Sequence, residues 1–265
     1  MVGDVVGRPG RDVLAQLLRP LRDELRLDLV VVNAENAAAG RGLTSRLAKE
    51  LLASGADVLT SGNHIYDVRE FVPDLQAGVL PVLVPANYPD GAPGKGVMTL
   101  TTGTGVRVTV INLMGRTFMP VAVDDPFRAA DRLLEEVPAG DIVLVDFHAE
   151  ATSEKQALAW YLDGRVAAVV GTHTHVPTAD ERLLPGGTAM VTDLGMTGAT
   201  DSIIGDDVQS VLRRFLTAMP TRLPVAAGGD AVMNAVLIEV DDATGLATHI
   251  ERVDRRCVVR SGSEQ

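Results

Sequence analysis

The stretch that decides the fold is VAAVVGTHTH, residues 166–175. It begins with an apolar run long enough for one buried strand, which stops at Gly171. His173 and His175 follow two positions apart, so an extended chain would direct both imidazoles to the same side. Neutral imidazole is a common ligand of transition metals. The sequence therefore predicts a strand whose end carries metal-binding side chains.

The same layout recurs at four other predicted strand ends. These strands end at Asp4, at Glu35 and Asn36, at Asn63 and His64, and at His148. In open α/β sheets, ligands bind at the carboxyl ends of the strands, so we expect one shared cleft. Two carboxylates, two amides and up to four imidazoles exceed the needs of one metal and suit two metals that share Glu35 or a bridging water. Paired metals hold the attacking and leaving oxygens of a displacement at phosphorus.

Each of these residues also has a simpler interpretation. A single histidine at a strand end is more often structural than a ligand, and isolated asparagines such as Asn36 and Asn63 more often serve turns or caps. Asp4 alone could cap a helix. Four of the five histidines nevertheless lie at these strand ends, whereas His249 is expected to be a surface or packing residue of the closing hairpin. The loop GRG at 40–42 is weak evidence for a phosphate contact.

The composition restricts the classes of partner. The chain has 265 residues and a formal net charge of -11, which disfavours duplex nucleic acid as a partner because phosphate backbones are bound by clustered Lys and Arg. Cys257 is the only cysteine, so no intramolecular disulfide can form. Without a signal peptide or a membrane-spanning apolar run, we expect a cytoplasmic protein with no membrane partner. A homo-oligomer is expected on base rates alone.

The order of elements favours an α/β fold. Helices are predicted at 11–27, 44–54, 70–75, 126–137, 153–162 and 207–218. Strands and helices alternate in the first third, a strand is predicted at 81–89, and hairpins are predicted at 97–115 and 233–254. This favours a sandwich of two packed mixed sheets with helices outside, ahead of a single doubly wound sheet.

The ends of the chain carry two further expectations. No linker or repeat interrupts the sequence, so residues 1–265 are predicted to form a single domain, with 261–265 disordered. Only Met1, Val2 and Gly3 precede Asp4, whereas strands average about 5–6 residues. We therefore expect the native chain to carry a few apolar residues before Met1.

Together the motifs resemble a known family. The motifs are GD at 3–4, NAEN at 33–36, GNH at 62–64, FHAEATSEK at 147–155, GTHTHVPTAD at 171–180, TDLGMTG at 192–198 and DSIIG at 201–205. They are similar to those of the YmdB-like bacterial metallophosphoesterases, within the calcineurin-like phosphoesterase superfamily. The resemblance implies a four-layer αββα sandwich, two mixed β-sheets flanked by helices. It also implies a dinuclear centre, with iron as the first choice and manganese or zinc as alternatives.

The resemblance also implies a set of site residues. One metal takes Asp4, Glu35, Asn36 and His175; the other takes Glu35, Asn63, His148 and His173. Glu35 bridges the two metals, while His64 stays unligated and faces the substrate as general acid, held by Asn63. The wider superfamily has a histidine two residues after its first aspartate, where this chain has Val6. The YmdB-like group shares this lack, and Asn36 is thought to compensate.

The implied activity is hydrolysis of small phosphodiesters, including 2',3'-cyclic nucleotides. The hypothesis is that a metal-bridging hydroxide attacks phosphorus while His64 protonates the leaving sugar oxygen. Two divalent ions, the carboxylates of Asp4 and Glu35, and one hydroxide leave one positive charge, which suits a phosphodiester monoanion. The alternatives are a phosphomonoesterase or nucleotidase on the same scaffold, and a nucleotide-binding regulator whose hydrolysis is incidental.

Overall fold

The computed structural model describes residues 1–260, so the expectation for 261–265 lies outside the described part. Its helices are α1 (Gly7–Leu25), α2 (Ser45–Ala53), α3 (Val72–Ala77), α4 (Pro126–Glu136), α5 (Thr152–Tyr161) and α6 (Val208–Thr217), with a 3-10 turn η1 (Arg69–Phe71) before α3. No helix in this part is both long and apolar enough to cross a membrane.

The larger sheet is mixed and has six strands in the order β4-β5-β6-β7-β9-β8. Its strands are β4 (Val97–Thr101), β5 (Arg107–Met114), β6 (Ile142–His148), β7 (Ala168–Thr172), β8 (Arg182–Leu183) and β9 (Ala189–Val191). β5, β6, β7 and β9 run parallel, with antiparallel β4 and β8 at the edges. β6 and β7 are buried along their whole length, which explains their near-continuous apolar sequences.

The second mixed sheet has the order β1-β10-β11-β14. Its strands are β1 (Asp4–Val5), β10 (Met196–Ala199), β11 (Asp230–Met233) and β14 (Arg255–Val258). Two further pairs are the parallel β2 (Val31–Asn33) and β3 (Val58–Thr60), and the antiparallel β12 (Val236–Asp241) and β13 (Leu246–Arg252). Val2 connects these two pairs. It forms a parallel bridge with Val32 of β2 and an antiparallel bridge with Ala235, the residue before β12.

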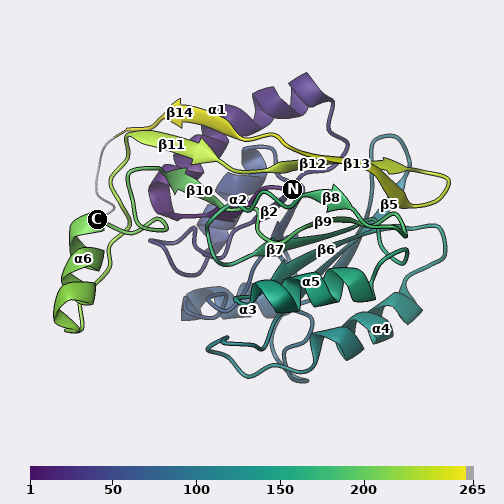
Figure 1. Ribbon diagram of the computed structural model, residues 1–265, viewed down its shortest axis with the longest axis horizontal. Helices are drawn as coiled ribbons and strands as arrows, with labels where there is room; N and C mark the ends of the chain where they lie inside the picture. Colours follow the sequence, from purple (N-terminus) through teal and green to yellow (C-terminus); the bar gives the residue numbers. More distant parts are fainter. Residues whose placement is uncertain (261–265) are drawn as a thin grey trace.

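The sheets and helices stack in four layers. α1 packs against β10, β11 and β14 and also against α2, while α4 and α5 pack on β5 and β7 (Figure 1). Three apolar clusters fill the spaces: one under α1 and α2, one between the sheets, and one under α4 and α5. The predicted sandwich of mixed sheets flanked by helices is therefore confirmed, and the single doubly wound sheet is wrong.

Several predicted boundaries need correction. α1 begins at Gly7 instead of residue 11, and the strands predicted to end at Asn36 and at His64 end earlier, at Asn33 in β2 and at Thr60 in β3. The strand predicted at 81–89 is reduced to isolated bridges at Val82 and Leu83. β2 and β3 pair with each other over only three residues, so each regular strand ends where this pairing ends.

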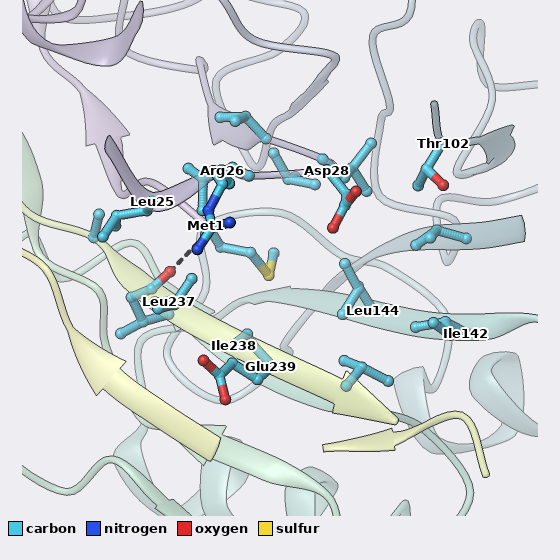
Figure 2. Close-up of a pocket in the computed structure, with 18 of the residues that line it drawn as sticks. Met1, Leu25, Arg26, Asp28, Thr102, Ile142, Leu144, Leu237, Ile238 and Glu239 are labelled. Atoms are coloured by element: carbon cyan, nitrogen blue, oxygen red, sulfur yellow. Dashed lines mark hydrogen bonds between the residues drawn. The ribbon is translucent and has the colours of Figure 1, made fainter. Parts of the chain in front are cut away.

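An apolar cavity of about 430 Å³ lies beside the first residue. Leu144 and Ile142 of β6 line it together with Leu237 and Ile238 of β12 (Figure 2). The Met1 ammonium donates a hydrogen bond to the carbonyl of Val236 at 2.8 Å. None of the predicted site residues lines this cavity, so it is separate from the strand ends described next.

Candidate metal centre

Most of the predicted ligands lie at or just after the carboxyl ends of parallel strands, but the prediction that a strand ends at Asp4 is wrong, because Asp4 is the first residue of its strand. His148 is the last residue of β6, and the neighbouring β7 ends one residue before His173. Asp4 opens β1, which runs parallel to β10. Glu35 and Asn63 follow β2 and β3, the other parallel pair. Segments far apart in the sequence thus deliver ligand-type side chains to one edge.

The ring of His148 is the centre of the best-assembled part. Its Nε2 lies 2.9 Å from Glu35 Oε1, 3.2 Å from Asn63 Oδ1 and 3.0 Å from His173 Nδ1. A single ring nitrogen carries at most one proton, which cannot serve three neighbours at once. Glu35, His148 and His173 each offer an atom within 4.8 Å of the others. This donor set of imidazole and carboxylate fits a transition metal.

Asp4 and His175 form a more open part of the same site. Asp4 is fully buried, and its Oδ1 lies 3.8 Å from His148 Nδ1 and 4.0 Å from His175 Nε2. This oxygen accepts no hydrogen bond from any described residue, and neither does the buried Oδ1 of Asn36. Buried oxygens without a partner are costly. Asp4 Oδ1, which lies near His175, and Asn36 Oδ1, whose residue lines the same cavity as His175, are therefore candidate oxygen ligands for a cation.

The two histidines reach the site by a different route from the predicted one. β7 ends at Thr172, and His173 and His175 have φ angles of 101° and 65°, so neither is in extended backbone. Non-glycine residues adopt this left-handed region at a cost and persist there when surrounding contacts enforce it. The alternation argument is thus wrong, although both rings still line the same cavity.

Asp193 and Lys155 supply those enforcing contacts. Asp193 Oδ2 accepts hydrogen bonds from the backbone N–H of Thr174 at 3.1 Å and from its hydroxyl at 2.7 Å. The same oxygen lies 2.6 Å from Lys155 Nζ, with both side chains almost fully buried. Thr174 separates the two histidines, so this buried ion pair fixes the loop that carries them.

Asp146 and Thr172 orient His148 from below. The Thr172 hydroxyl lies 3.0 Å from His148 Nδ1 and donates to Asp146 Oδ1 at 2.7 Å. The other oxygen of Asp146 accepts from Asn33 Nδ2 at 3.1 Å and from the Thr60 hydroxyl. This buried chain fixes the ring so that Nε2 faces Glu35. Hydrogen-bonded partners of this kind commonly orient metal-binding histidines.

His64 lines a cavity of about 580 Å³ together with Glu35, His173 and His175. Its backbone N–H donates to Glu35 Oε2 at 3.0 Å, and its ring Nδ1 lies 2.8 Å from Asp67 Oδ2. Asp67, rather than Asn63, therefore contacts the ring. Sequence reasoning missed Asp67, although its place three residues after His64 in the turn GNHIYD is a usable signal. His249 pairs with Glu251 at the surface, as expected.

The protein's own charges are strongly coupled at this site. Burial raises the pKa of Asp4 to about 6. Burial opposes ionisation of Glu35 as well, but the adjacent His148 charge and hydrogen bonds lower its pKa to about 2. Burial likewise disfavours charged His148, yet Glu35 raises its pKa to about 9. Burial and the neighbouring His148 lower the pKa of His173 to about 3, which leaves it neutral, the form that binds metals.

These features define an α/β protein with a candidate metal centre at the carboxyl ends of its strands. The chain belongs to the YmdB-like protein family, whose model matches residues 1–253. It is 49% identical over 253 residues to a protein of Bacillus subtilis strain 168 named 2',3'-cyclic-nucleotide 2'-phosphodiesterase, covering 95% of this chain and 94% of that protein.

Two solved structures share the whole fold. A hypothetical protein from Thermus thermophilus superimposes with a TM-score of 0.90 at 47% identity, covering 96% of this chain and 97% of that one. A novel phosphatase from Mycoplasma pneumoniae gives a TM-score of 0.88 at 31% identity, covering 96% and 92%. The predicted family resemblance is therefore confirmed, and the fold is that of phosphoesterases.

Proposed function

We propose that this chain is a metal-dependent phosphodiesterase that acts on small phosphodiesters, with 2',3'-cyclic nucleotides as its substrate class. The observation that carries the proposal is the convergence of Glu35, Asn63 and His173 on one nitrogen of His148. The name of the Bacillus subtilis relative supports the substrate class. Residues 1–265 would act as one domain, since the family model spans nearly all of them.

We infer that two metal ions are held by the predicted ligand set, and the grouping of Glu35, His148 and His173 supports this. Asp4, Glu35, Asn36 and His175 would hold one, and Glu35, Asn63, His148 and His173 would hold the other. Bound metal ions would supply positive charge for the phosphoryl oxygens and lower the pKa of a water nucleophile. Iron is the first metal to test, followed by manganese and zinc, because nitrogen and oxygen ligands without thiolate suit all three.

His64 would act as the general acid. Its ring lines the cavity and is only partly exposed, with 26% of the side chain accessible. Asp67 holds Nδ1, which leaves Nε2 as the nitrogen that delivers a proton to the leaving oxygen. The backbone N–H of His64 also donates to Glu35, so the same residue helps to orient the shared carboxylate.

The His64→Ala variant tests this assignment. We expect hydrolysis of 2',3'-cyclic AMP to fall by about 100-fold or more, because general acids contribute about 10²–10⁴-fold. Hydrolysis of bis-p-nitrophenyl phosphate should fall much less, since its leaving group needs no proton. Metal content, measured by inductively coupled plasma mass spectrometry, should stay at the wild-type value. Loss of a metal in this variant would make His64 a ligand and overturn its role as acid.

A phosphomonoesterase is the second candidate, because the Mycoplasma pneumoniae structure is described as a phosphatase. The metal-loaded enzyme should therefore be assayed on bis-p-nitrophenyl phosphate and on the monoester p-nitrophenyl phosphate under identical conditions. A higher kcat/KM for the diester supports the proposed function. A higher kcat/KM for the monoester would replace it with the phosphatase.

A further inference from the structure

Three arginines line the cavity that contains His64, and the proposed chemistry assigns none of them a role. Arg41, Arg214 and Arg222 share this cavity of about 580 Å³ with Glu35 and His175. All three arginines are exposed. In a chain with a formal net charge of -11, such a convergence of positive charge beside one site is unexpected without an anion to bind.

The turn at 203–206 ties Arg214 and Arg222 to the metal centre. Its Ile204 carbonyl accepts a hydrogen bond from His175 Nδ1 at 2.7 Å. The segment that returns from α6 is fastened to the same turn, because Ala226 N–H donates to the Gly205 carbonyl at 2.9 Å. Arg214 lies on α6 and Arg222 on the returning segment, so both are placed relative to His175 by backbone contacts.

The loop at 36–42 brings Arg41 to the same place. A Cβ added to Gly40 would lie 3.0 Å from Cγ2 of Val225, so this loop packs closely against the segment that returns from α6. Asn36 anchors the loop by donating from Nδ2 to the Gly40 carbonyl at 2.9 Å. The GRG motif at 40–42, weak evidence by itself, thus lies next to the other two arginines.

These guanidinium groups are available for a ligand. Within residues 1–260, no hydrogen bond or salt bridge engages the side chains of Arg41, Arg214 or Arg222. Asp206 lines the same cavity, but among residues 1–260 no salt bridge joins its carboxylate to Arg41 or Arg214. Guanidinium groups present paired N–H donors that match the oxygens of a phosphate.

We propose that Arg41, Arg214 and Arg222 form a subsite for a second phosphate of the substrate. The preferred substrates are then nucleotides that carry a phosphate in addition to the phosphodiester, such as 5'-phosphorylated 2',3'-cyclic nucleotides. This inference rests on the proposed function and specifies its substrate class. The metal centre holds the diester, and the arginines bind the phosphate at the far end of the same molecule.

Equilibrium binding tests the subsite without requiring turnover. Isothermal titration of the metal-loaded protein should compare adenosine 3',5'-bisphosphate with adenosine 3'-monophosphate. We expect the bisphosphate to bind at least about tenfold more tightly, as one charge-assisted hydrogen bond suffices for this ratio. Arg214→Ala and Arg222→Ala should each reduce the preference, and the preference should weaken as salt is added.

Arg213→Ala is the matched control, since Arg213 is exposed on the same helix but does not line the cavity. It should keep the wild-type preference. Equal affinities for the two nucleotides in the wild type, or the same loss in Arg213→Ala, would overturn the subsite.

Kinetics separates the two proposals. If the subsite is real, 5'-phosphorylated 2',3'-cyclic AMP should have a lower KM than 2',3'-cyclic AMP, and Arg222→Ala should remove the difference. A binding preference without any diester hydrolysis would reject the proposed function and keep the subsite. Diester hydrolysis without tighter binding of the bisphosphate would keep the proposed function and reject the subsite.

Discussion

The two halves of the proposed metal centre are built in different ways. Around His148, ligand-type atoms already meet at 2.9–3.2 Å, and Thr172 and Asp146 support the ring from below. Around Asp4, Oδ1 lies 4.0 Å from His175 Nε2, and this oxygen accepts no hydrogen bond from any residue in the part of the chain that the structure describes. We call these the assembled half and the open half. The contrast predicts that the buried hydrogen bonds of Thr172 and Asp146 make the half around His148 the tighter metal site.

The strands that carry the two halves differ in the same direction. His148 ends a seven-residue strand that is buried throughout and has partners on both sides. Asp4 is the first residue of a two-residue strand, and this strand pairs only with β10 among the described strands. Val2, just before it, forms single bridges to Val32 and Ala235. A short strand restricts its side chains through fewer hydrogen bonds. We therefore expect the backbone to hold Asp4 less rigidly than His148.

The largest effect on stability is expected from the buried Lys155–Asp193 ion pair, which supports the loop that carries a histidine of each half. Lys155→Met leaves Asp193 as a buried carboxylate without its cation and should destabilise the protein by about 3–5 kcal/mol. Because Asp193 holds Thr174 between the two metal-site histidines, both metals should also bind more weakly. Urea unfolding of the metal-free protein measures the first effect, and metal analysis measures the second.

Arg165→Ala is the control for this change, because it breaks an ion pair with Asp131 in which both side chains are well exposed. Exposed pairs contribute about 0–1 kcal/mol. A Lys155→Met variant no less stable than this control would show that the buried pair does not hold the loop.

The next effect concerns Glu35, the carboxylate that we propose both halves share. Glu35→Gln removes the charge beside His148 and should lower kcat/KM on 2',3'-cyclic AMP by more than about 100-fold, since even partners behind a ligand contribute about 10–100-fold. Both metals should be lost together. Retention of one metal per chain would mean that Glu35 belongs to one half alone.

A smaller change should affect the assembled half alone. Thr172→Val removes the hydroxyl between Asp146 and His148, and we expect about 10–100-fold weaker binding of one metal. Thr172→Ser retains the hydroxyl and should restore binding. If Thr172→Val instead weakened both metals equally, the support beneath His148 would not explain the difference between the halves.

Most of the proposed ligand positions could be predicted because they follow apolar strands. His148 ends its strand as the sequence predicts, and Glu35 and Asn63 lie shortly after the paired strands β2 and β3, whereas Asp4 opens its strand. The four-layer fold was equally accessible, because hairpins and alternating elements leave a distinctive pattern. Apolar runs and the residues that follow them are local features of the sequence, so they can be recognised without knowing the contacts between distant residues.

The supports of the site could not be predicted, because they are contacts between distant residues. Lys155 and Asp193 are 38 positions apart, and nothing in either local sequence indicates the pairing. The positive φ angles of His173 and His175 arise from these same contacts and contradict the extended backbone that their spacing indicates. The sequence therefore predicts most of the side chains that meet, but not the contacts between distant residues that hold them in place.

The smallest expected effect is the order in which the metals leave. Because Asp4 Oδ1 and His175 Nε2 lie farther apart than the atoms around His148 Nε2, a chelator should remove the metal of the open half at a lower concentration than the metal of the assembled half. A tenfold difference in affinity corresponds to about 1.4 kcal/mol. Titration with EDTA should pass through a species with one metal per chain, and kcat should already be lost at that stage if both metals are needed. In Thr172→Val the two steps should merge, because the assembled half then loses its advantage. Simultaneous loss of both metals in the wild type would show that the two halves bind as a unit despite their different construction.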